Sequence, residues 1–167
     1  MPTEYKTYYP SKIGTFLIRG TEEGITALEF VKESANEPGP VKRSNVPACL
    51  QACLKQLDEY FAGRRKEFSL RLTPEGTGFQ QRVWQELLNI PFGETVSYGD
   101  VARAIGSPKA VRAVGGANGR NKIAVIIPCH RVIGSSGTLT GYGGGLWRKE
   151  WLLDHERNIL AGGGEST

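Results

Sequence analysis

The sequence predicts two parts, an α/β N-terminal domain with an antiparallel sheet and a mostly helical C-terminal domain. Three short runs of β-branched and aromatic residues, separated by turn sequences, open the chain. An amphipathic helical pattern follows them, and from residue 77 onward capped helical patterns predominate. A chain of 167 residues suits one compact domain or two small ones.

The N-terminal runs predict an antiparallel meander with strands at 5–9, 13–19 and 25–32. The stretch 33–41 (ESANEPGPV) indicates a loop. Apolar residues then recur at helical spacing from Val46 to Phe61, with Gly63 just past the end. Cys49 and Cys53 lie four residues apart on this apolar stripe, so we interpret them as core thiols without chemistry. Residues 68–72 (FSLRL) alternate like one more strand.

The linker at 73–78 places the domain boundary between residues 76 and 77, giving domains 1–76 and 77–167. Thr77 with Gln80 predicts a capping box for a helix that stops at Ile90-Pro91. Ser97 with Asp100 predicts a second box, for a short helix over 98–105. Ser107-Pro108 predicts a further helix to about residue 119, so these two helices have the outline of a helix-turn-helix.

The charge of the chain is unevenly distributed. Residues 101–150 hold eight Lys or Arg against one acid, a local charge of +7, whereas the whole chain carries only +4. The second helix of the pair consists mainly of small residues, including Gly115-Gly116. These small residues suit either close packing against another helix or approach to a narrow minor groove, and the local charge favours the second interpretation. Nucleic acid is therefore the expected partner.

Composition excludes several other classes. With 39% hydrophobic and 23% charged residues, the chain is neither collagenous nor extensively disordered. No stretch is apolar enough to span a membrane, and the N-terminus lacks the pattern of a signal peptide, so we expect no membrane association. Three cysteines and two histidines provide neither a disulfide framework nor zinc-finger spacing, which favours a reducing, cytoplasmic location.

Cys129 is the candidate nucleophile. It follows the apolar run 123–127, which predicts a buried strand, and it lies in a turn fixed by Pro128. His130 and Arg131 come next, and an electropositive setting of this kind lowers a thiol pKa. A buried core cysteine is the common alternative, but the basic neighbours favour the nucleophile.

The segment 128–132 (PCHRV) resembles the active-site motif of the O6-alkylguanine-DNA alkyltransferase family. The resemblance covers most of the chain, with motifs in family order at Gly78–Trp84, Ile90–Glu94, Ser97–Gly99, Arg112–Gly116, Asn121, Pro128–Val132, Gly141–Gly145 and Lys149–Leu153. It implies a ribonuclease-H-like N-terminal domain and a C-terminal domain with a winged-helix-like helix-turn-helix that binds double-stranded DNA through the minor groove.

The family's activity is suicidal DNA repair by a methylated-DNA-[protein]-cysteine S-methyltransferase. The resemblance implies that the protein flips O6-alkylguanine, and less well O4-alkylthymine, out of the duplex and transfers the alkyl group irreversibly to Cys129. His130 would deprotonate Cys129 through a water and Glu156 would orient His130, so the three would act like a catalytic triad with a water inserted. Asn121 would hold this network, and Tyr98 would donate toward guanine N3.

The resemblance also implies the residues that contact DNA and the base. Arg112 would fill the space left by the extruded nucleotide. A glycine-containing loop would line the base pocket, and the backbone carbonyls of Cys129 and Val132 would accept from the guanine amino group. The full expected set is Arg112, Ala113, Gly115, Val132, Tyr142, Gly143 and Gly144.

The chain departs from the family pattern at several points. It lacks the N-terminal cysteines and histidines with which some members bind zinc, so we expect no metal and no cofactor. Gly143 stands where some members carry Ser, which removes a hydroxyl but keeps a backbone donor. The chain keeps Cys129 where alkyltransferase-like proteins have Trp, so activity is expected. We expect no obligate protein partner, and cooperative self-association on DNA stays open.

Two other classes of function use parts of the same pattern. A cysteine hydrolase would use Cys129 and His130 but would turn over repeatedly. A simple DNA-binding regulator would explain the charge and the helix pair but not the nucleophilic setting. The stoichiometry of methyl transfer to the intact protein discriminates among the three.

Overall fold

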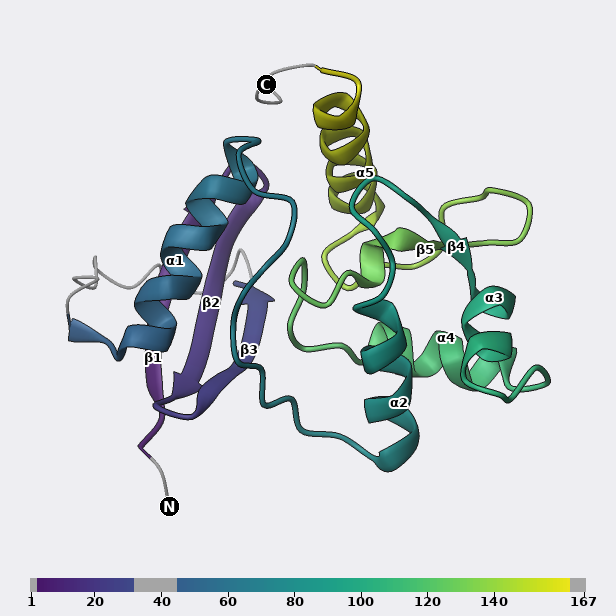
Figure 1. The fold of residues 1–167 in the computed structure, drawn as a ribbon, viewed down its shortest axis with the longest axis horizontal. Coiled ribbons are helices and arrows are strands. Elements are labelled where there is room, and N and C mark those ends of the chain that lie inside the picture. The colour runs from purple at the N-terminus through teal and green to yellow at the C-terminus, as the bar shows by residue number, and fades with distance from the viewer. Residues whose placement is uncertain (1–2, 32–44, 163–167) are drawn as a thin grey trace. The chain divides into compact units, whose positions relative to one another are not determined.

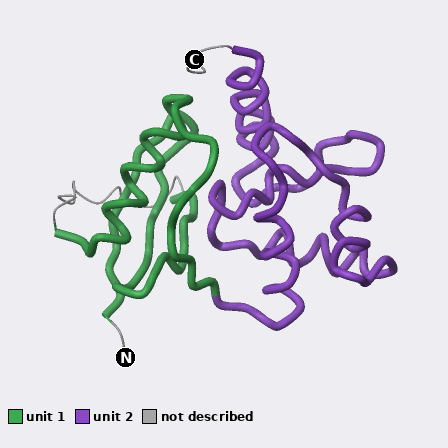
Figure 2. The backbone as a smooth tube through the Cα atoms, viewed as in Figure 1, with its two compact units in different colours: residues 1–74 green, residues 75–167 purple. Residues whose placement is uncertain are grey.

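The computed structural model describes residues 3–31 and 45–162, and it divides at Pro74/Glu75 into two compact units (Figure 2). The first unit carries the antiparallel sheet and one helix, and the second is mainly helical (Figure 1). The predicted fold class, an α/β part followed by a helical part, is confirmed.

In the first unit, β1 (Tyr5–Ser11), β2 (Gly14–Thr21) and β3 (Gly24–Phe30) form the predicted antiparallel meander. Helix α1 (Ala48–Phe61) packs on the sheet, as Figure 1 shows. Aromatic rings fill the space between them: the ring centroids of Phe16 and Phe61 lie 6.2 Å apart and those of Tyr9 and Phe61 lie 5.9 Å apart. The alternation of buried residues along β1 and β2 therefore supplies one face of a core whose other face is α1.

The two cysteines of α1 differ in their surroundings. Cys53 is fully buried in the core, and burial raises its pKa to about 12. Cys49 is half-buried, and its thiol donates to the carbonyl of Thr21 at 2.8 Å. The interpretation as a core thiol is thus confirmed for Cys53, whereas Cys49 lies at the margin of the core.

The strand predicted at 68–72 is wrong in its extent. Only Leu72 forms a bridge, parallel to Ile25, whose backbone exchanges hydrogen bonds with Arg71 and Thr73. Earlier in the segment, the backbone of Ser69 is hydrogen-bonded by the side-chain amide of Gln56 and not by a neighbouring strand. Gln56 donates to the Ser69 carbonyl and accepts from the Ser69 N–H. The predicted strand at 25–32 ends in the structure at Phe30, and its residue Lys32 lies outside the described residues, as does the predicted loop at 33–41.

In the second unit, helices α2 (Gly78–Leu87), α3 (Tyr98–Ala104) and α4 (Val111–Gly119) pack against one another. Both predicted capping boxes are present, at Thr77 with Gln80 and at Ser97 with Asp100. Trp84 of α2 is buried and donates its indole N–H to the Ala117 carbonyl of α4 at 2.9 Å, which fixes these two helices against each other.

Helix α4 starts later than predicted. The expected start was Pro108, but Ala110 N–H donates to the carbonyl of Ser107 and closes a separate turn, so the helix begins at Val111. Gly106, with φ +77°, ends the preceding helical segment in the left-handed conformation that glycine adopts without cost. The two helices and their turn form the predicted helix-turn-helix outline.

Three further elements complete the second unit: the 3₁₀ turn η2 (Cys129–Arg131), a short parallel pair formed by β4 (Val96–Ser97) and β5 (Val132–Ile133), and helix α5 (Leu146–Leu160). The β4–β5 pair sets the start of α3 beside the segment that follows Cys129. None of the helices among the described residues is long and apolar enough to cross a membrane.

Candidate active site

The segment before Cys129 is a turn closed by side-chain hydrogen bonds, so the buried strand predicted for 123–127 is wrong. Asn121 accepts from the backbone N–H of Ile123 at 3.0 Å and donates to the carbonyl of Ile127 at 2.8 Å, so its side chain closes the segment into a loop. Val125 within it has φ +67°, which no strand contains. An apolar run predicts burial correctly here, but burial alone does not distinguish a strand from a compact turn.

Cys129 opens the 3₁₀ turn η2 and is 6% exposed. Its backbone N–H donates to Ile127 at 2.7 Å, and its carbonyl accepts from the Asn118 amide at 3.4 Å. The turn also buries the next two residues, His130 and Arg131. The short turn therefore places one thiol, one imidazole and one guanidinium together beneath the surface.

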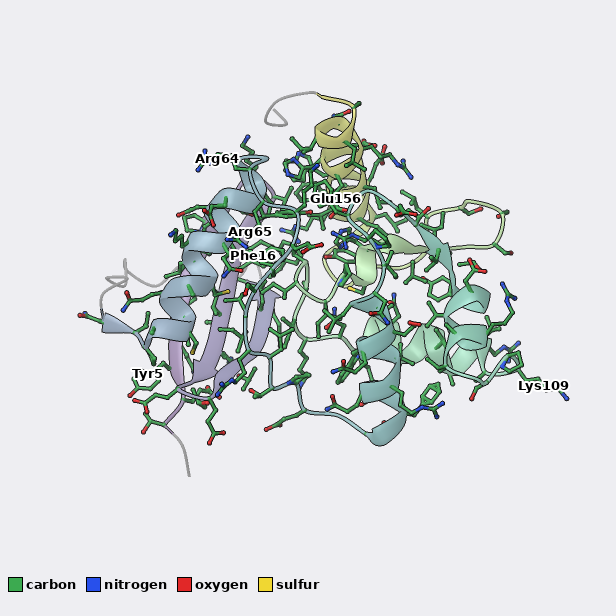
Figure 3. The ribbon with its side chains drawn as sticks, viewed as in Figure 1. Tyr5, Phe16, Arg64, Arg65, Lys109 and Glu156 are labelled. Carbon is green, nitrogen blue, oxygen red and sulfur yellow. The ribbon has the colours of Figure 1, made fainter. Side chains whose placement is uncertain are left out.

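The carboxylate of Glu156, a residue of α5 that is labelled in Figure 3, contacts both His130 and Arg131 and is the centre of this cluster. Its Oε2 lies 2.7 Å from His130 Nε2 and accepts from Arg131 Nη2 at 2.9 Å. Its Oε1 accepts from Arg131 Nε at 2.8 Å and from the Gly93 backbone N–H at 3.1 Å. Arg131 also donates through Nη1 to the carbonyl of Ile90 at 2.7 Å. A fully buried carboxylate is tolerated because it is paired and hydrogen-bonded in this way.

These contacts define the protonation states. Burial favours the neutral acid, but His130 and Arg131 outweigh it and hold the pKa of Glu156 well below its usual value, so the carboxylate is ionised. Burial lowers the pKa of His130, and this effect exceeds the opposing effect of Glu156, so the imidazole is neutral near pH 7. An ionised carboxylate only accepts, so His130 Nε2 carries the hydrogen and Nδ1 presents a lone pair. Nδ1 is buried and has no hydrogen-bond partner among the described residues.

The predicted lowering of the Cys129 pKa is wrong. Burial raises the pKa of the thiol, and the Asn121 side chain and the charge of Lys149 offset this effect only in part. The basic neighbours are present as expected, but the desolvation of a thiolate at this depth outweighs them. Cys129 is consequently a thiol at rest and depends on a base to become a nucleophile.

A second group of contacts ties the loop before α5 to the segment after the turn. Lys149 is fully buried, and its ammonium donates to the carbonyls of Val132 at 2.6 Å and Thr140 at 3.1 Å. Burial lowers the pKa of Lys149. Tyr98, at the start of α3, shares a hydrogen bond of 2.6 Å with the Thr140 hydroxyl.

The expected site residues fall into two places. Cys129, His130, Asn121 and Glu156 meet at the turn. Burial raises the pKa of Tyr142 well above the usual value, and the negative charge of Glu156 adds to this effect. Gly143 is exposed in the same loop, and the Gly144 carbonyl accepts from Arg148 at 2.8 Å.

The other place is helix α4. Arg112 and Ala113 are exposed on it, and Gly115 is half-buried. A methyl group added to Gly115 would lie 3.9 Å from a ring carbon of Tyr98, an ordinary contact, so packing within the protein does not require glycine there. No hydrogen bond or ion pair in the described structure links Arg112 to the Cys129 turn.

Sequence reasoning missed three residues of the site: Arg131 as a partner of Glu156, Lys149 and Thr140. The signal for Lys149 is present in the sequence. Lys149, Leu152, Leu153 and Glu156 recur at i, i+3, i+4 and i+7, so two charged residues share the buried stripe of one helix. Charged residues on a buried stripe are paired or functional. Among the described residues, no group of three or more His, Cys, Asp or Glu could hold a metal ion.

The second unit thus combines a helix-turn-helix outline with a buried cluster of Cys129, His130 and Glu156. Two family models match the chain: "6-O-methylguanine DNA methyltransferase, ribonuclease-like domain" over residues 5–74 and "6-O-methylguanine DNA methyltransferase, DNA binding domain" over residues 78–158. The chain belongs to the 6-O-methylguanine DNA methyltransferase family.

Relatives match over nearly their full length. A methylated-DNA--protein-cysteine methyltransferase of Methanosarcina acetivorans is 48% identical over 152 residues, 91% of this chain and 97% of the relative. The methylated-DNA--protein-cysteine methyltransferase of Mycobacterium tuberculosis is 50% identical over 148 residues, 89% of each chain. The crystal structure of the Mycobacterium tuberculosis O6-methylguanine methyltransferase has a TM-score of 0.82 at 47% identity and covers 94% of each chain. The structure of Mycobacterium tuberculosis OGT in complex with DNA has a TM-score of 0.81 at 45% identity, covering 92% of this chain and 93% of the other.

The Glu156 network predicts how stability depends on pH. Because the pKa of Glu156 is depressed in the folded state, its carboxylate stabilises the fold above the unfolded pKa of about 4.3, and that contribution is lost as the pH falls further. Glu156→Gln should lower the free energy of unfolding at pH 7 by about 3–5 kcal/mol, since it leaves Arg131 buried and unpaired.

Denaturant unfolding at pH values between 7 and 2.5 measures this difference. We expect the gap between the native protein and Glu156→Gln to narrow steadily below pH about 4.3. The surface variant Glu150→Gln, on the same helix but exposed, serves as the control and should follow the native protein. A gap that stays constant to pH 2.5 would contradict an ionised, paired Glu156.

Proposed function

We propose that this protein repairs DNA by transferring the alkyl group of O6-alkylguanine to its own Cys129, irreversibly and once per molecule. The observation that carries the proposal is the buried Cys-His-Glu cluster, in which an ionised carboxylate fixes a neutral imidazole beside a buried cysteine. Family membership supports it, because the relatives are named for methyl transfer from DNA to a protein cysteine.

The proton of Cys129 would pass to His130 Nδ1. Adjacent side chains on one turn do not readily bond each other directly, so a bridging water would carry the proton. The thiolate sulfur then attacks the alkyl carbon and a C–S bond forms. The C–O bond breaks, its electron pair stays with the guanine, and the product is a thioether at Cys129. The imidazolium formed is stabilised by Glu156, which Arg131 and Gly93 hold in place.

Because burial raises the pKa of the Cys129 thiol, the transfer needs a base, and His130 would supply it. A thiol that stays protonated at rest is protected from adventitious alkylation and oxidation, and it becomes nucleophilic only as the proton leaves toward His130. Tyr98 would donate toward guanine N3 as negative charge moves onto the leaving base. Asn121 would hold the turn that presents Cys129, in agreement with its hydrogen bonds to Ile123 and Ile127.

Double-stranded DNA is the proposed partner, bound through its minor groove by α4. The exposed positions on α4 carry one cation and small side chains, and glycine at 115 is not explained by packing within the protein. Two of the eight cations in residues 101–150, Arg131 and Lys149, are buried and paired inside the protein. The exposed cations of this stretch would contact phosphates, which gives affinity without sequence preference; they are Arg103, Lys109, Arg112, Arg120 and Lys122. The mycobacterial relative solved in complex with DNA supports this partner. Cooperative self-association on DNA and transfer from O4-alkylthymine stay proposals of the same kind.

The flipped base would enter beside the loop that holds Tyr142, Gly143 and Gly144. Glycines there permit close approach of the backbone, so a backbone N–H could bond the substituted oxygen. The carbonyls of Cys129 and Val132 would accept from the guanine amino group, and the Val132 carbonyl is already oriented by Lys149. The three cysteines are free thiols, which fits the reducing cytoplasm as the place of action.

The first test is stoichiometry. Incubation with a duplex that carries one O6-methylguanine should add one methyl group, on Cys129, as read by intact-protein and peptide mass spectrometry. Cys129→Ser should abolish transfer while it leaves the fold and duplex affinity nearly unchanged, because a hydroxyl is a much poorer nucleophile without a strong base. The matched control is Cys49→Ser, because Cys49 is half-buried, whereas Cys53 lies in the core and its replacement would disturb the fold. The Cys49→Ser variant should transfer the methyl group fully.

Two results would contradict the assignment: methyl transfer to another residue in Cys129→Ser, or repeated turnover in the native protein. The second would favour the hydrolase class. Duplex binding without any transfer would favour the regulator class.

Arg112 provides a test that separates base flipping from chemistry. If Arg112 supports the extruded state, Arg112→Ala should slow repair of duplex substrate by about one to three decades, because unstacking costs a few kcal/mol and each 1.36 kcal/mol is about tenfold in rate. Reaction with free O6-benzylguanine, which needs no extrusion, should be nearly unchanged. Single-turnover rates on both substrates measure the difference.

Two further variants complete this test. Arg112→Lys should rescue only in part, since a compact ammonium lacks the planar fork that can stack and hydrogen-bond. Lys109→Ala, an exposed cation in the turn before α4, is the control for lost charge and should weaken binding without a specific loss in the repair step. Equal slowing of Arg112→Ala on duplex and free base would remove the flipping role.

A further inference from the structure

The hydrogen bond between Tyr98 and Thr140 joins the first residue of α3 to the loop before α5. The two hydroxyl oxygens lie 2.6 Å apart, and 42 residues separate them along the chain. Nothing in the expected site includes Thr140. The Thr140 hydroxyl is therefore held against the phenol of Tyr98, the group proposed to donate to the leaving guanine.

Both ends of this hydrogen bond are anchored by the backbone. Tyr98 follows Ser97, which caps α3 through a capping box and pairs with Ile133 in the β4–β5 ladder. The carbonyl of Thr140 accepts from the buried ammonium of Lys149 at 3.1 Å. The pair is therefore a contact between two fixed segments, and the position of the phenol oxygen follows from it.

Either hydroxyl can be the donor in this hydrogen bond, and which one donates decides whether the phenol hydrogen is free for the substrate. A phenol has one hydrogen to donate and can accept as well, and so does a threonine hydroxyl. When Thr140 donates to the phenol oxygen, the hydrogen of Tyr98 stays available for a third group. Accepting a hydrogen bond also makes a hydroxyl a better donor, because hydrogen bonds in a chain polarise one another.

We propose that Thr140 is a positioning residue for Tyr98: its hydroxyl holds the phenol oxygen and donates to it, so that the phenol hydrogen is directed to the departing guanine. This inference rests on the proposed function, because it assigns Thr140 a part in the same transfer. Thr140 acts through Tyr98 and makes no contact with the reacting atoms. Its effect falls on the chemical step and not on DNA binding or base extrusion.

Removal of the hydroxyl alone tests the proposal. Thr140→Val keeps the branched shape and should slow single-turnover transfer by about three- to tenfold, the range expected for one net hydrogen bond. The slowing should be equal with a duplex containing O6-methylguanine and with free O6-benzylguanine, and duplex affinity should not change. Thr140→Ser restores the hydroxyl and should return the rate to within about twofold of the native rate.

A double-mutant cycle with Tyr98→Phe identifies the partner through which Thr140 acts. In the Tyr98→Phe background Thr140→Val should have no further effect, because the phenol that it positions is gone. Thr138→Val is the matched control: Thr138 lies in the same segment, and its hydroxyl contacts Ser136 at 2.6 Å and not Tyr98. This variant should react at the native rate.

The outcomes separate this inference from the proposed function. If the native protein methylates Cys129 but Thr140→Val reacts at the native rate or faster, Thr140 does not position Tyr98 and the proposed function stands. Additive effects of Thr140→Val and Tyr98→Phe would also overturn the inference. If the native protein does not methylate Cys129, the proposed function itself fails.

Discussion

The ionised carboxylate of Glu156 is the constraint on which the C-terminal unit depends. It is fully buried, and such a group is stable only where charged and polar donors surround it. Its donors come from two segments: the imidazole and guanidinium of the Cys129 turn, and the Gly93 backbone N–H between α2 and β4. One charge on α5 therefore sets the relative positions of the turn, the helix and the loop. Gly93 meets this demand with φ +82°, where an added Cβ would lie 2.0 Å from Leu160.

The same charge determines the chemistry that we propose. Arg131 pairs with Glu156 through two nitrogens, so the carboxylate is balanced without a protonated histidine. His130 can then stay neutral, with its hydrogen on the nitrogen that faces Glu156 and its lone pair on the other. The thiol stays protonated until the base acts. A protein that reacts once gains from this arrangement, because an exposed thiolate would be consumed by other electrophiles.

Sequence patterns predicted the parts of the structure that local interactions determine. The capping boxes at Thr77 and Ser97 are confirmed because their hydrogen bonds join residues three apart. The segment 123–127 was mispredicted as a strand because its apolar run indicates burial and not conformation, and Asn121 closes it into a turn. The start of α4 was placed three residues early for a similar reason: an isolated turn precedes the helix.

The candidate site shows the same limit at longer range. Cys129, His130 and Glu156 were expected from a resemblance, but no local pattern pairs Arg131 with a carboxylate 25 residues away. The sign of the Cys129 pKa shift also depends on depth of burial, which a sequence of basic neighbours does not give. The charged residues on the buried stripe of α5 were the one sequence signal that could have revealed part of this network.

The protonation state of His130 tests most directly whether Glu156 holds a neutral imidazole as the base for Cys129. Nitrogen-15 NMR of the imidazole nitrogens at pH 7, with His130 distinguished from the other histidine by a His130→Gln variant, reports which nitrogen carries hydrogen. The contact of His130 Nε2 with the ionised Glu156 predicts a neutral ring with hydrogen on Nε2 and a bare Nδ1. A doubly protonated ring, or hydrogen on Nδ1, would contradict this prediction, because neither form has a lone pair on Nδ1 to accept the proton of Cys129.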